Sequence, residues 1–467
     1  MSYLPETSNK GVEFDADLIR RYDVMGPRYT SYPTAVQFRD DFNVYDFADA
    51  AERSRVNAGP LSLYFHLPFC DHVCYYCACN KIVTRDHSRV APYIEHLKTE
   101  MSRVAPLLDN TRPIRQLHWG GGTPTFLNND QMSELMEAIA GNFALQTDDK
   151  RDYSIEIDPR VASESTIQHL ADLGFNRISV GVQDFDEQVQ KAVHRIQSER
   201  ETLAVIDAAR SAGFRSLNVD LIYGLPFQNL KRFASTLERV IEIAPDRLAI
   251  YNYAHMPHLF KPQRRIQEQD LPSAEEKLAI LQFTVERLTN AGYVYIGMDH
   301  FARPDDELAV ALHNGSLHRN FQGYSTHADC DLAAFGVSSI ARLDDCYSQN
   351  QRDIEDYYQV LDKGELPVAK GIRLNQDDII RRDLIQRILC QGGFDVVDIE
   401  IRYGIEFLDY FADTLTRLWD LANDGLIKWD GYRLNVLPAG RMLMRNIAMV
   451  FDHYQAQATE QRHSRMI

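Results

Sequence analysis

Four cysteines lie within ten positions of one another, in the segment FCDHVCYYCACN at residues 69–80. Their spacing is Cys70-x3-Cys74-x2-Cys77-x-Cys79, whereas the other three cysteines of the chain are scattered singly. Crowded thiols have three common explanations, which are disulfide bonds, a structural zinc site and an iron–sulfur cluster.

The cellular setting that the sequence indicates disfavours disulfides. The first twenty residues carry acids and no apolar core, so they do not form a signal peptide. No stretch approaches the roughly 18 apolar residues of a membrane span. We therefore expect a cytoplasmic protein, in a reducing compartment where disulfides rarely persist. The scattered cysteines, Cys330, Cys346 and Cys390, are expected to be small buried apolar residues.

Zinc and iron–sulfur chemistry remain as the alternatives. A closed zinc site takes four ligands, usually as two separated pairs, and no second CxxC or HxxxH pair occurs in the chain. Zinc would therefore need all four clustered thiols, including the cramped Cys77-Ala78-Cys79. A cluster held by Cys70, Cys74 and Cys77 would leave one iron open for a ligand, as chemistry at a metal requires. The spacing favours the cluster.

Seven strand-like runs recur along the middle of the chain, and amphipathic stretches with helical periodicity lie between them. Alternation of strand and helix predicts an α/β fold with a parallel sheet and right-handed crossovers. This number of repeats indicates a complete or partial (β/α) barrel, with its site at the carboxyl ends of the strands. The predicted strands are 61–67, 114–120, 153–158, 175–182, 216–224, 247–254 and 293–299.

Polar residues and glycines gather at these strand ends. Residues 120–124, GGGTP, follow the second strand, where glycine either forms a tight turn or lets the backbone approach a ligand. Glu156 stands in an apolar strand, so it is either paired in the core or reaches a ligand hydroxyl. Further polar residues at later strand ends, each of which alone could be an ordinary loop residue, are Gln183, Asp184, Arg195 and Asp220.

The two ends of the chain differ from the middle. GPRYTSYPT at residues 26–34 predicts an extended arm that buries little core and closes over the barrel mouth, because proline and its neighbours avoid helix. The last hundred residues are mainly helical, with a hairpin that turns at Asp430-Gly431. We predict an N-terminal arm (1–45), a barrel domain (46–365) and a mainly helical C-terminal domain (366–467).

The net charge of −17 argues against nucleic acid as a partner. Helices with a hairpin resemble a winged helix, but no basic recognition surface is visible, so a lid or packing role is expected for the C-terminal domain. Local arginines can still bind a carboxylate ligand within an acidic protein.

The Cys-x3-Cys-x2-Cys spacing, with Tyr76 just before the third cysteine, resembles the signature of the radical S-adenosylmethionine (SAM) superfamily. In that superfamily the amino and carboxylate groups of the methionine moiety chelate the open iron. An electron from the cluster then cleaves the sulfonium, which gives a 5′-deoxyadenosyl radical.

A closer resemblance covers nearly the whole chain. GPRYTSYPT, LYFHLPFCDHVCYYCACNKIVTR, QLHWGGGTPT, NVDLIYGLP, IGMDHFARPDDELA and HRNFQGYSTH are similar to segments of the oxygen-independent coproporphyrinogen III oxidases (dehydrogenases) of anaerobic haem synthesis. The resemblance implies an oxidoreductase that decarboxylates two propionates of coproporphyrinogen III to vinyl groups and so gives protoporphyrinogen IX. The related haem-chaperone branch typically lacks the tyrosine-rich arm and a cysteine at the place of Cys79.

The resemblance also implies the cofactors, namely one 4Fe–4S cluster and two SAM molecules, with an electron donor and acceptor that the sequence does not identify. It places the cluster on Cys70, Cys74 and Cys77, while we expect Cys79 to lie nearby without binding iron. A monomer is expected, and no catalytic residue is assigned.

Family binding positions carry over one by one. The SAM molecule on the cluster would be held by Tyr64, Gly121, Glu156 and Ile340. The second SAM molecule would be lined by Tyr76, Gly122, Thr123, Gln183, Arg195, Asp220 and Ala254. Candidate anchors for the substrate propionates, each of which could instead form an ordinary ion pair, are Arg28, His66, His300, Arg303 and Arg319.

Two other functions stay open at this point. One is a porphyrin-binding protein that keeps the cluster for transfer or sensing, and the other is a porphyrin-cleaving methyltransferase of the same superfamily. Their products differ: unchanged tetrapyrrole for a carrier, and methylated or ring-opened product for the methyltransferase.

Overall fold

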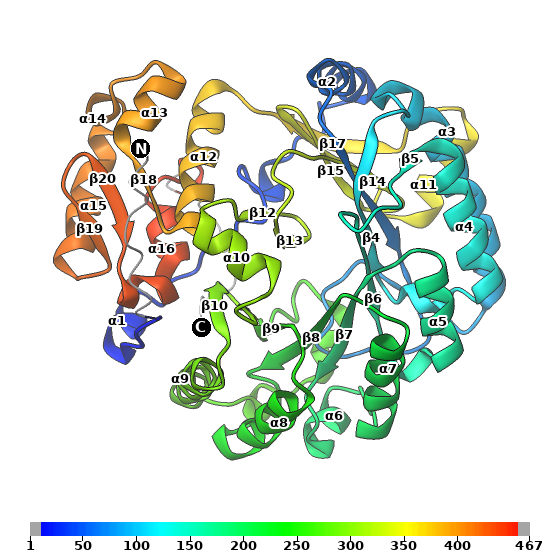
Figure 1. Ribbon diagram of the computed structural model, residues 1–467, viewed down its shortest axis with the longest axis horizontal. Coiled ribbons are helices and arrows are strands. Elements are labelled where there is room, and N and C mark those ends of the chain that lie inside the picture. Colours follow the sequence, from blue (N-terminus) through cyan, green and yellow to red (C-terminus); the bar gives the residue numbers. More distant parts are fainter. Residues whose placement is uncertain (1–10, 456–467) are drawn as a thin grey trace.

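The computed structural model describes residues 11–455, so residues 1–10 of the expected arm and 456–467 of the expected C-terminal domain lie outside the described residues. Its centre is a curved sheet in which six parallel strands pair in chain order (Figure 1). These strands are β1 (Leu61–Leu67), β4 (Pro113–Gly121), β6 (Asp152–Ile157), β7 (Arg177–Gln183), β8 (Ser216–Tyr223) and β9 (Arg247–Asn252).

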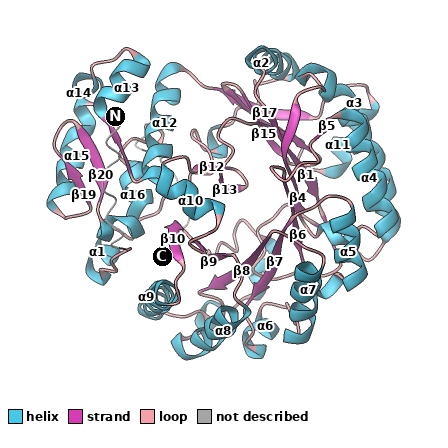
Figure 2. Cartoon of the chain, viewed as in Figure 1, coloured by secondary structure: helices cyan, strands magenta, loops and turns pink. Residues whose placement is uncertain are grey.

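The predicted alternation of strands and helices is confirmed. The helices cover the outer face of the sheet, with the strands toward the centre of the molecule (Figure 2). The seventh predicted run forms β10 (Val294–Gly297), which antiparallel β11 (His300–Ala302) separates from β9. The covering helices are α3 (Val90–Leu108), α4 (Asn129–Asn142), α5 (Glu164–Asp172), α6 (Glu187–Ala192), α7 (Glu199–Ser211), α8 (Leu230–Ile243) and α9 (Ala274–Asn290).

The two faces of the parallel strands differ in polarity. In β1 the odd-numbered residues join the main apolar core beneath the helices, whereas Tyr64 lies on the inner face. In β6, Ile155 is in the same core, and Glu156 points inward toward His118 of β4. Burial of the outer face stabilises the sheet. The polar inner face leaves the lumen available for ligands.

The sheet does not close, so the structure is the partial barrel of the two expected forms. On the other side of β1 the sheet continues through parallel β14 (Asp331–Phe335) and then antiparallel β15 (Ile340–Leu343), β16 (Cys346–Asn350) and β17 (Val368–Arg373). The opening between the two edges contains α10 (Glu307–Asn314) and the hairpin of β12 (His318–Asn320) and β13 (Gly323–Ser325) (Figure 1). Helix α11 (Ile354–Asp362) packs on α3.

The arm contains α1 (Ala16–Arg21) and leads to α2 (Val44–Asn57). The expectation that it buries little is wrong, because Tyr29 and Tyr32 are only 1% and 2% exposed and belong to the apolar core of the C-terminal domain. Tyr29 Oη donates a hydrogen bond to Asp452 at 2.8 Å. The arm therefore ties the chain near its start to its far end, a link that local composition does not reveal.

The C-terminal domain combines helices with a small antiparallel sheet, and the predicted hairpin around Asp430-Gly431 is confirmed. Because β17 belongs to the large sheet, we propose that this domain begins at α12 rather than at residue 366. No helix within residues 11–455 has the length and apolar character needed to cross a membrane. The elements are α12 (Gln376–Gln391), β18 (Gly393–Asp395), α13 (Val396–Tyr403), α14 (Phe407–Tyr410), α15 (Ala412–Asn423), β19 (Ile427–Trp429), β20 (Arg433–Val436) and α16 (Met444–Met449).

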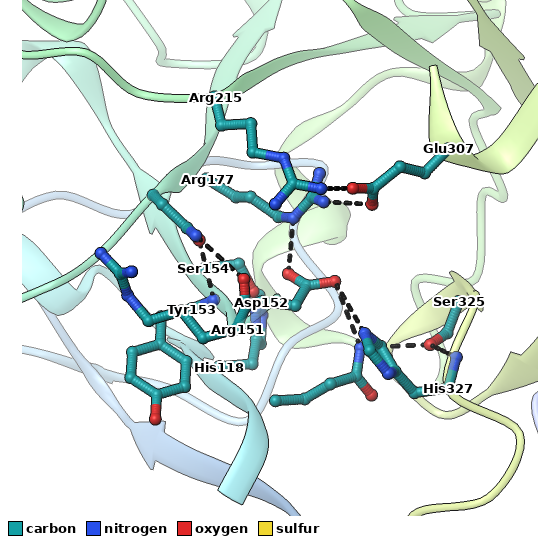
Figure 3. A network of polar contacts seen from close by, with 12 residues as sticks. His118, Arg151, Asp152, Tyr153, Ser154, Arg177, Arg215, Glu307, Ser325 and His327 are labelled. Carbon is teal, nitrogen blue, oxygen red and sulfur yellow. Dashed lines mark hydrogen bonds and ion pairs between the residues drawn. The ribbon is translucent and has the colours of Figure 1, made fainter. Parts of the chain in front are cut away.

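A network of ion pairs closes the amino ends of the central strands (Figure 3). Arg177, the first residue of β7, pairs with Asp152, the first residue of β6, at 2.8 Å and also with Glu307 of α10. Glu307 pairs in addition with Arg215, and Asp152 accepts a hydrogen bond from Gln116 at 3.4 Å. These charges neutralise one another at the floor of the barrel.

Replacing Arg177 by alanine tests this network. The change would leave Asp152 without its principal partner in a largely buried position, so we expect the free energy of unfolding to fall by about 3–5 kcal/mol. Urea unfolding measures the loss. Arg55→Ala is the matched control, since Arg55 and Glu52 form an exposed pair on α2 and little loss is expected. Equal losses in the two variants would contradict a stabilising floor.

Candidate active site

The cysteine segment lies at the carboxyl ends of the parallel strands. It forms a loop of residues 71–81 between the short strands β2 (Phe69–Cys70) and β3 (Ile82–Val83), which pair in parallel directly after β1. In the middle of the loop, the backbone N–H of Tyr75 donates to the carbonyl of Val193 at 2.9 Å. The loop is therefore held at both ends and at its centre.

Three of the four thiols are neighbours, and one of them, Cys74, lies beside two cations. Cys74 is buried, and Cys70 and Cys77 are partly buried. One guanidinium nitrogen of Arg160 and one of Arg195 each lie 3.6 Å from Cys74 Sγ. Burial raises the pKa of the Cys70 thiol to about 11, and the charges of the neighbouring Cys77 and Cys74 add to the rise. Thiolates that repel one another in this way need the nearby positive charge.

The spacing of these thiols fits a cluster better than a single metal ion. Tetrahedral zinc with bonds of about 2.3 Å would bring its sulfur ligands to about 3.8 Å from one another. Within residues 11–455, Cys70, Cys74 and Cys77 do not form a group whose ligand atoms all lie within 4.8 Å, whereas His327, Asp329 and Cys330 do. The wider spacing suits a ligand with several metal atoms, and the adjacent arginines suit its anionic thiolates.

A carboxylate holds both arginines. Asp158, directly after β6, accepts from Arg160 Nη2 at 2.6 Å and from Arg195 Nη1 at 3.0 Å. Burial opposes ionisation, but the charges of Arg195 and Arg160 outweigh it and lower the pKa of Asp158 to about 2. Arg195 was among the residues predicted from the sequence, whereas Asp158 and Arg160 were not, although Asp158-Pro159-Arg160 stands at the end of the predicted strand 153–158.

Cys79 contacts Cys77 rather than the arginine side of the loop. Its thiol hydrogen-bonds to Cys77, and this bond, with Lys81 nearby, lowers the pKa of Cys77 to about 6 despite burial. The same contact raises the pKa of Cys79. The prediction that Cys79 binds no iron stays a prediction.

The glycine turn after β4 packs directly against the cysteine loop. Gly121 has a φ of +112°, which side chains other than glycine rarely adopt. A Cβ atom on Gly122 would lie 2.6 Å from the carbonyl carbon of Pro68 and 2.7 Å from the carbonyl oxygen of Phe69. Glycine is therefore required here by close backbone contact, and the same absence of side chains leaves the turn accessible to a ligand.

Glu156 reaches the same turn from β6. Its Oε2 accepts from the backbone N–H of Gly121 at 3.2 Å, and its Oε1 lies 3.4 Å from Nε2 of His118, on which Tyr64 stacks. Burial opposes ionisation, but His118 and the Gly121 N–H lower the pKa of Glu156, so it is an anion. Because 46% of its side-chain surface remains exposed, the geometry favours a carboxylate that reaches toward a ligand.

A second polar group lies on the neighbouring strands. Gln183 ends β7 with a φ of +66°, and Ala254 follows β9. Asp220 of β8 accepts from Ser179 Oγ at 2.7 Å and from Asn218 Nδ2 at 2.8 Å. Burial raises the pKa of Asp220 to about 6. Arg195 adjoins this group, because its Nη2 donates to the carbonyl of Gly181 in β7 at 2.6 Å.

The remaining expected contacts lie in the cysteine loop, beside Cys70 and on β15. The backbone carbonyl of Tyr76 in the cysteine loop accepts from Gln263 Nε2 at 3.0 Å. Thr123 Oγ1 lies 3.5 Å from Cys70 Sγ. Ile340 begins β15 and packs against a small apolar cluster that includes Tyr347.

Two of the expected propionate anchors do not fit that role. Both ring nitrogens of His66 are engaged, at 3.0 Å from Tyr64 Oη and 2.8 Å from the carbonyl of Asn80, and burial lowers the pKa of His66. Arg303 pairs with Asp305 at 3.3 Å on the surface. Its backbone also bonds to the residue before β9, at the amino end of the sheet and away from the thiols. The other three anchors lie closer to the lumen.

Among those three, Arg319 has the most available donors. It is 5% exposed, lies over the ring of Tyr324 at 4.8 Å, and its Nε and Nη1 have no hydrogen-bond partner among the described residues. Burial, with the charge of Arg319, lowers the pKa of His300 to about 3, so His300 is neutral. Arg28 of the arm reaches Asp299 at 3.4 Å and the carbonyl of Asn252 at 3.2 Å.

The scattered cysteines are buried, as expected. Cys330, Cys346 and Cys390 lie beneath the surface in three different parts of the fold. Burial raises the pKa of each thiol to about 12, so all three are protonated at neutral pH.

Comparisons with known proteins agree with this geometry. The radical SAM superfamily matches residues 64–240. Oxygen-independent coproporphyrinogen III oxidase of Pseudomonas aeruginosa is 52% identical over 98% of this chain and 99% of its own, and that of Escherichia coli is 49% identical over 98% and 99%. The solved structure of the Escherichia coli coproporphyrinogen III oxidase, described as a radical SAM enzyme, covers 95% of this chain and 100% of its own with a TM-score of 0.91 and 48% identity.

Replacing Gly122 by alanine tests the contact between the turn and the cysteine loop. The added methyl group would displace backbone at Pro68 and Phe69, so we expect a loss of about 1–3 kcal/mol in the free energy of unfolding. Gly141→Ala is the control, because this helical glycine of α4 has open space around it and alanine should stabilise by about 0.5–1 kcal/mol. Urea unfolding of both variants measures the difference, and a neutral Gly122→Ala would show that the two loops are not in contact.

Proposed function

The chain belongs to the oxygen-independent coproporphyrinogen III oxidase family, and from this membership we propose how its residues carry out that family's reaction. The enzyme is an oxidoreductase of haem biosynthesis. It converts two propionate side chains of coproporphyrinogen III to vinyl groups and yields protoporphyrinogen IX and carbon dioxide. The observation that carries the assignment is the set of three thiols at the carboxyl ends of a parallel sheet, beside two buried guanidinium groups.

The proposed ligands of the 4Fe–4S cluster are Cys70, Cys74 and Cys77. When bound, the cluster supplies the electron that splits SAM to a 5′-deoxyadenosyl radical, which removes a hydrogen atom from the β-carbon of a propionate. The β-hydrogen of a propionate is not acidic, so general-base chemistry cannot replace this route. The electron left after loss of carbon dioxide goes to an acceptor of unidentified class, as the first electron comes from an unidentified donor.

The residues of the chain position the reactants and exclude water. Arg160 and Arg195 offset the negative charge of the thiolates, and Asp158 holds both arginines in place. At the other end of the same strands, the network around Arg177 closes the floor of the lumen. Exclusion of water from below protects a reactive intermediate from side reactions.

Two SAM molecules are proposed because two polar groups lie side by side on successive strands. The first group, around Glu156 and Gly121, adjoins the glycine turn and suits the ribose hydroxyls and carboxylate of a SAM molecule on the cluster. The second group, around Gln183, Asp220 and Arg195, lies on β7, on β8 and in the loop after α6, and would bind the other molecule.

The proposed setting is the cytoplasm, with the protein acting as a monomer. All seven cysteines of the chain are free thiols, as a reducing compartment maintains them and as cluster assembly requires. Both proposed SAM groups come from a single chain, so no second copy is needed to complete them.

Product analysis tests the function. Reconstituted protein is incubated anaerobically with coproporphyrinogen III, SAM and a reductant, and the porphyrins are separated after oxidation. We expect protoporphyrin IX, through the tricarboxylate with one vinyl group, and 5′-deoxyadenosine. Unchanged tetrapyrrole would indicate a carrier, and methylated or ring-opened product a methyltransferase.

Cysteine substitutions test the cluster ligands. Alanine at Cys70, Cys74 or Cys77 removes one proposed ligand, so iron content and the visible charge-transfer band should fall to near background in each variant. Cys79→Ser is the matched control and should keep the 4Fe–4S spectrum and 5′-deoxyadenosine formation. A full, active cluster in any of the three alanine variants would refute the ligand assignment, and loss of the cluster in Cys79→Ser would make Cys79 a ligand.

Binding stoichiometry tests the two SAM sites. Equilibrium dialysis of the reconstituted wild type should give two molecules per chain. Glu156→Ala should weaken the molecule on the cluster about 10–100-fold and suppress its cleavage, because a charged hydrogen-bond acceptor is lost. Asp220→Asn should weaken the other molecule and leave cleavage of the first intact. One molecule per wild-type chain with full turnover would contradict the second site.

A further inference from the structure

A polar cavity of about 590 Å³ lies beside the opening of the barrel, and of the anchors described above Arg319 lines it. Its walls come from β12, from β14 to β16 and from α12 and α13 of the C-terminal domain, and Thr30 of the arm also lines it. Figure 1 shows α12 and β12 side by side at this opening. The volume is within the range of about 300–1,000 Å³ that small-molecule sites occupy.

The cavity is cationic in a protein of net charge −17. Five arginines and only two aspartates line it. One of the aspartates, Asp383, already accepts hydrogen bonds from Arg387 Nε at 3.0 Å and from Tyr403 Oη at 3.0 Å. The positive charge that remains lies on Arg319, Arg342 and Arg382.

Besides Arg319, both Arg342 and Arg382 have N–H donors without a partner in the described part of the chain. Arg342 of β15 donates one nitrogen to the carbonyl of Cys330 at 3.1 Å and lies 3.8 Å from Asp331, but its Nε is buried without a hydrogen-bond partner among residues 11–455. Within the same described residues, Nη1 of Arg382 is also buried and unpartnered. A buried N–H group without a hydrogen-bond partner is destabilising unless an acceptor such as an anion completes it.

The pKa of the neighbouring histidine is affected by this positive charge. His318 of β12 lines the cavity. Burial lowers the pKa of His318 to about 3, and the charges of Arg342 and Arg382 add to the effect. His318 therefore contributes no charge of its own, and both arginines act on the same space.

The aromatic wall of the cavity extends to Ile340 on β15. Phe321 and Tyr347 line it, and the same two aromatic side chains pack with Ile340, the proposed contact of the first SAM molecule, in one apolar cluster. A molecule that spans this aromatic wall would have one end beside the reactive centre and another among the arginines.

We infer that Arg342 and Arg382 bind propionate carboxylates of the tetrapyrrole that are not being decarboxylated, while the reacting propionate lies in the lumen. Guanidinium groups recognise carboxylates by paired N–H donors, and a substrate with four propionates always carries spare ones. The inference rests on the proposed function for the identity of the substrate. The cavity itself would bind any tetrapyrrole carboxylate of that size.

Equilibrium binding of a tetrapyrrole carboxylate tests the inferred site independently of catalysis. The probe is coproporphyrin III, the stable aromatic tetracarboxylate, titrated by fluorescence quenching into reconstituted full-length protein, with its tetramethyl ester as the uncharged comparison. We expect the acid to bind and the ester to bind far more weakly. Arg342→Gln and Arg382→Gln should each weaken the acid about tenfold or more, because each removes charge-assisted hydrogen bonds. Arg55→Gln, on the surface of α2, is the matched control and should leave binding unchanged.

Kinetic and cofactor measurements distinguish a loss of substrate binding from a loss of the cluster or of SAM cleavage. In both variants KM for coproporphyrinogen III should rise with little change in kcat, while iron content and 5′-deoxyadenosine formation without substrate stay at wild-type levels. Arg382→Lys keeps the positive charge but lacks the paired N–H donors of a guanidinium. Its affinity for coproporphyrin III and its KM should therefore lie between those of the wild type and of Arg382→Gln. Unchanged binding and KM in folded variants, or displacement of the probe by millimolar inorganic phosphate alone, would overturn the inference. If the wild type makes no vinyl product but the variants bind coproporphyrin III more weakly than it does, the inferred carboxylate site is supported and the proposed function is refuted.

Discussion

The carboxylate of Asp158, held between two buried guanidinium groups, determines how the thiol end of the barrel is built. Without it Arg160 and Arg195 would be like charges in mutual repulsion 3.6 Å from Cys74, and only Arg195 would keep another described acceptor, the carbonyl of Gly181. One carboxylate neutralises only part of two cations, so a positive charge is left beside the sulfurs. Removing such groups from water is costly, and an anionic partner at this position offsets the cost.

The same strands therefore carry opposite kinds of electrostatics at their two ends. At the amino end, two acids and two bases satisfy one another, which gives rigidity and no net charge among Asp152, Glu307, Arg177 and Arg215. At the carboxyl end, Glu156 keeps nearly half of its surface free, and Asp220 is held in a buried site where its carboxyl group protonates near pH 6. This separation of a stable floor from a reactive mouth is the general pattern of parallel barrels.

Regular periodicity made the parallel strands and the hairpin at Asp430-Gly431 predictable from sequence, because both signals are local. Strands β14 to β17 escaped notice, since they are short and separated by tight turns such as that at Asp344. Burial of Tyr29 could not be predicted, because its partner Asp452 is more than four hundred residues away. In the site, the cysteine spacing was informative by itself, whereas the role of Asp158 depends on two arginines that only the fold brings together.

Deep burial of Cys330, Cys346 and Cys390 has a consequence for how the protein matures. Iron and sulfide delivered to a folded chain react with thiols that can lose a proton, and burial keeps these three protonated at neutral pH. Cys330 is the nearest competitor, because it lines the polar cavity and lies with His327 and Asp329 in a group that could hold a metal ion. Its raised pKa therefore matters for where the cluster assembles, so the fidelity of loading depends on the core as well as on the loop that follows β1.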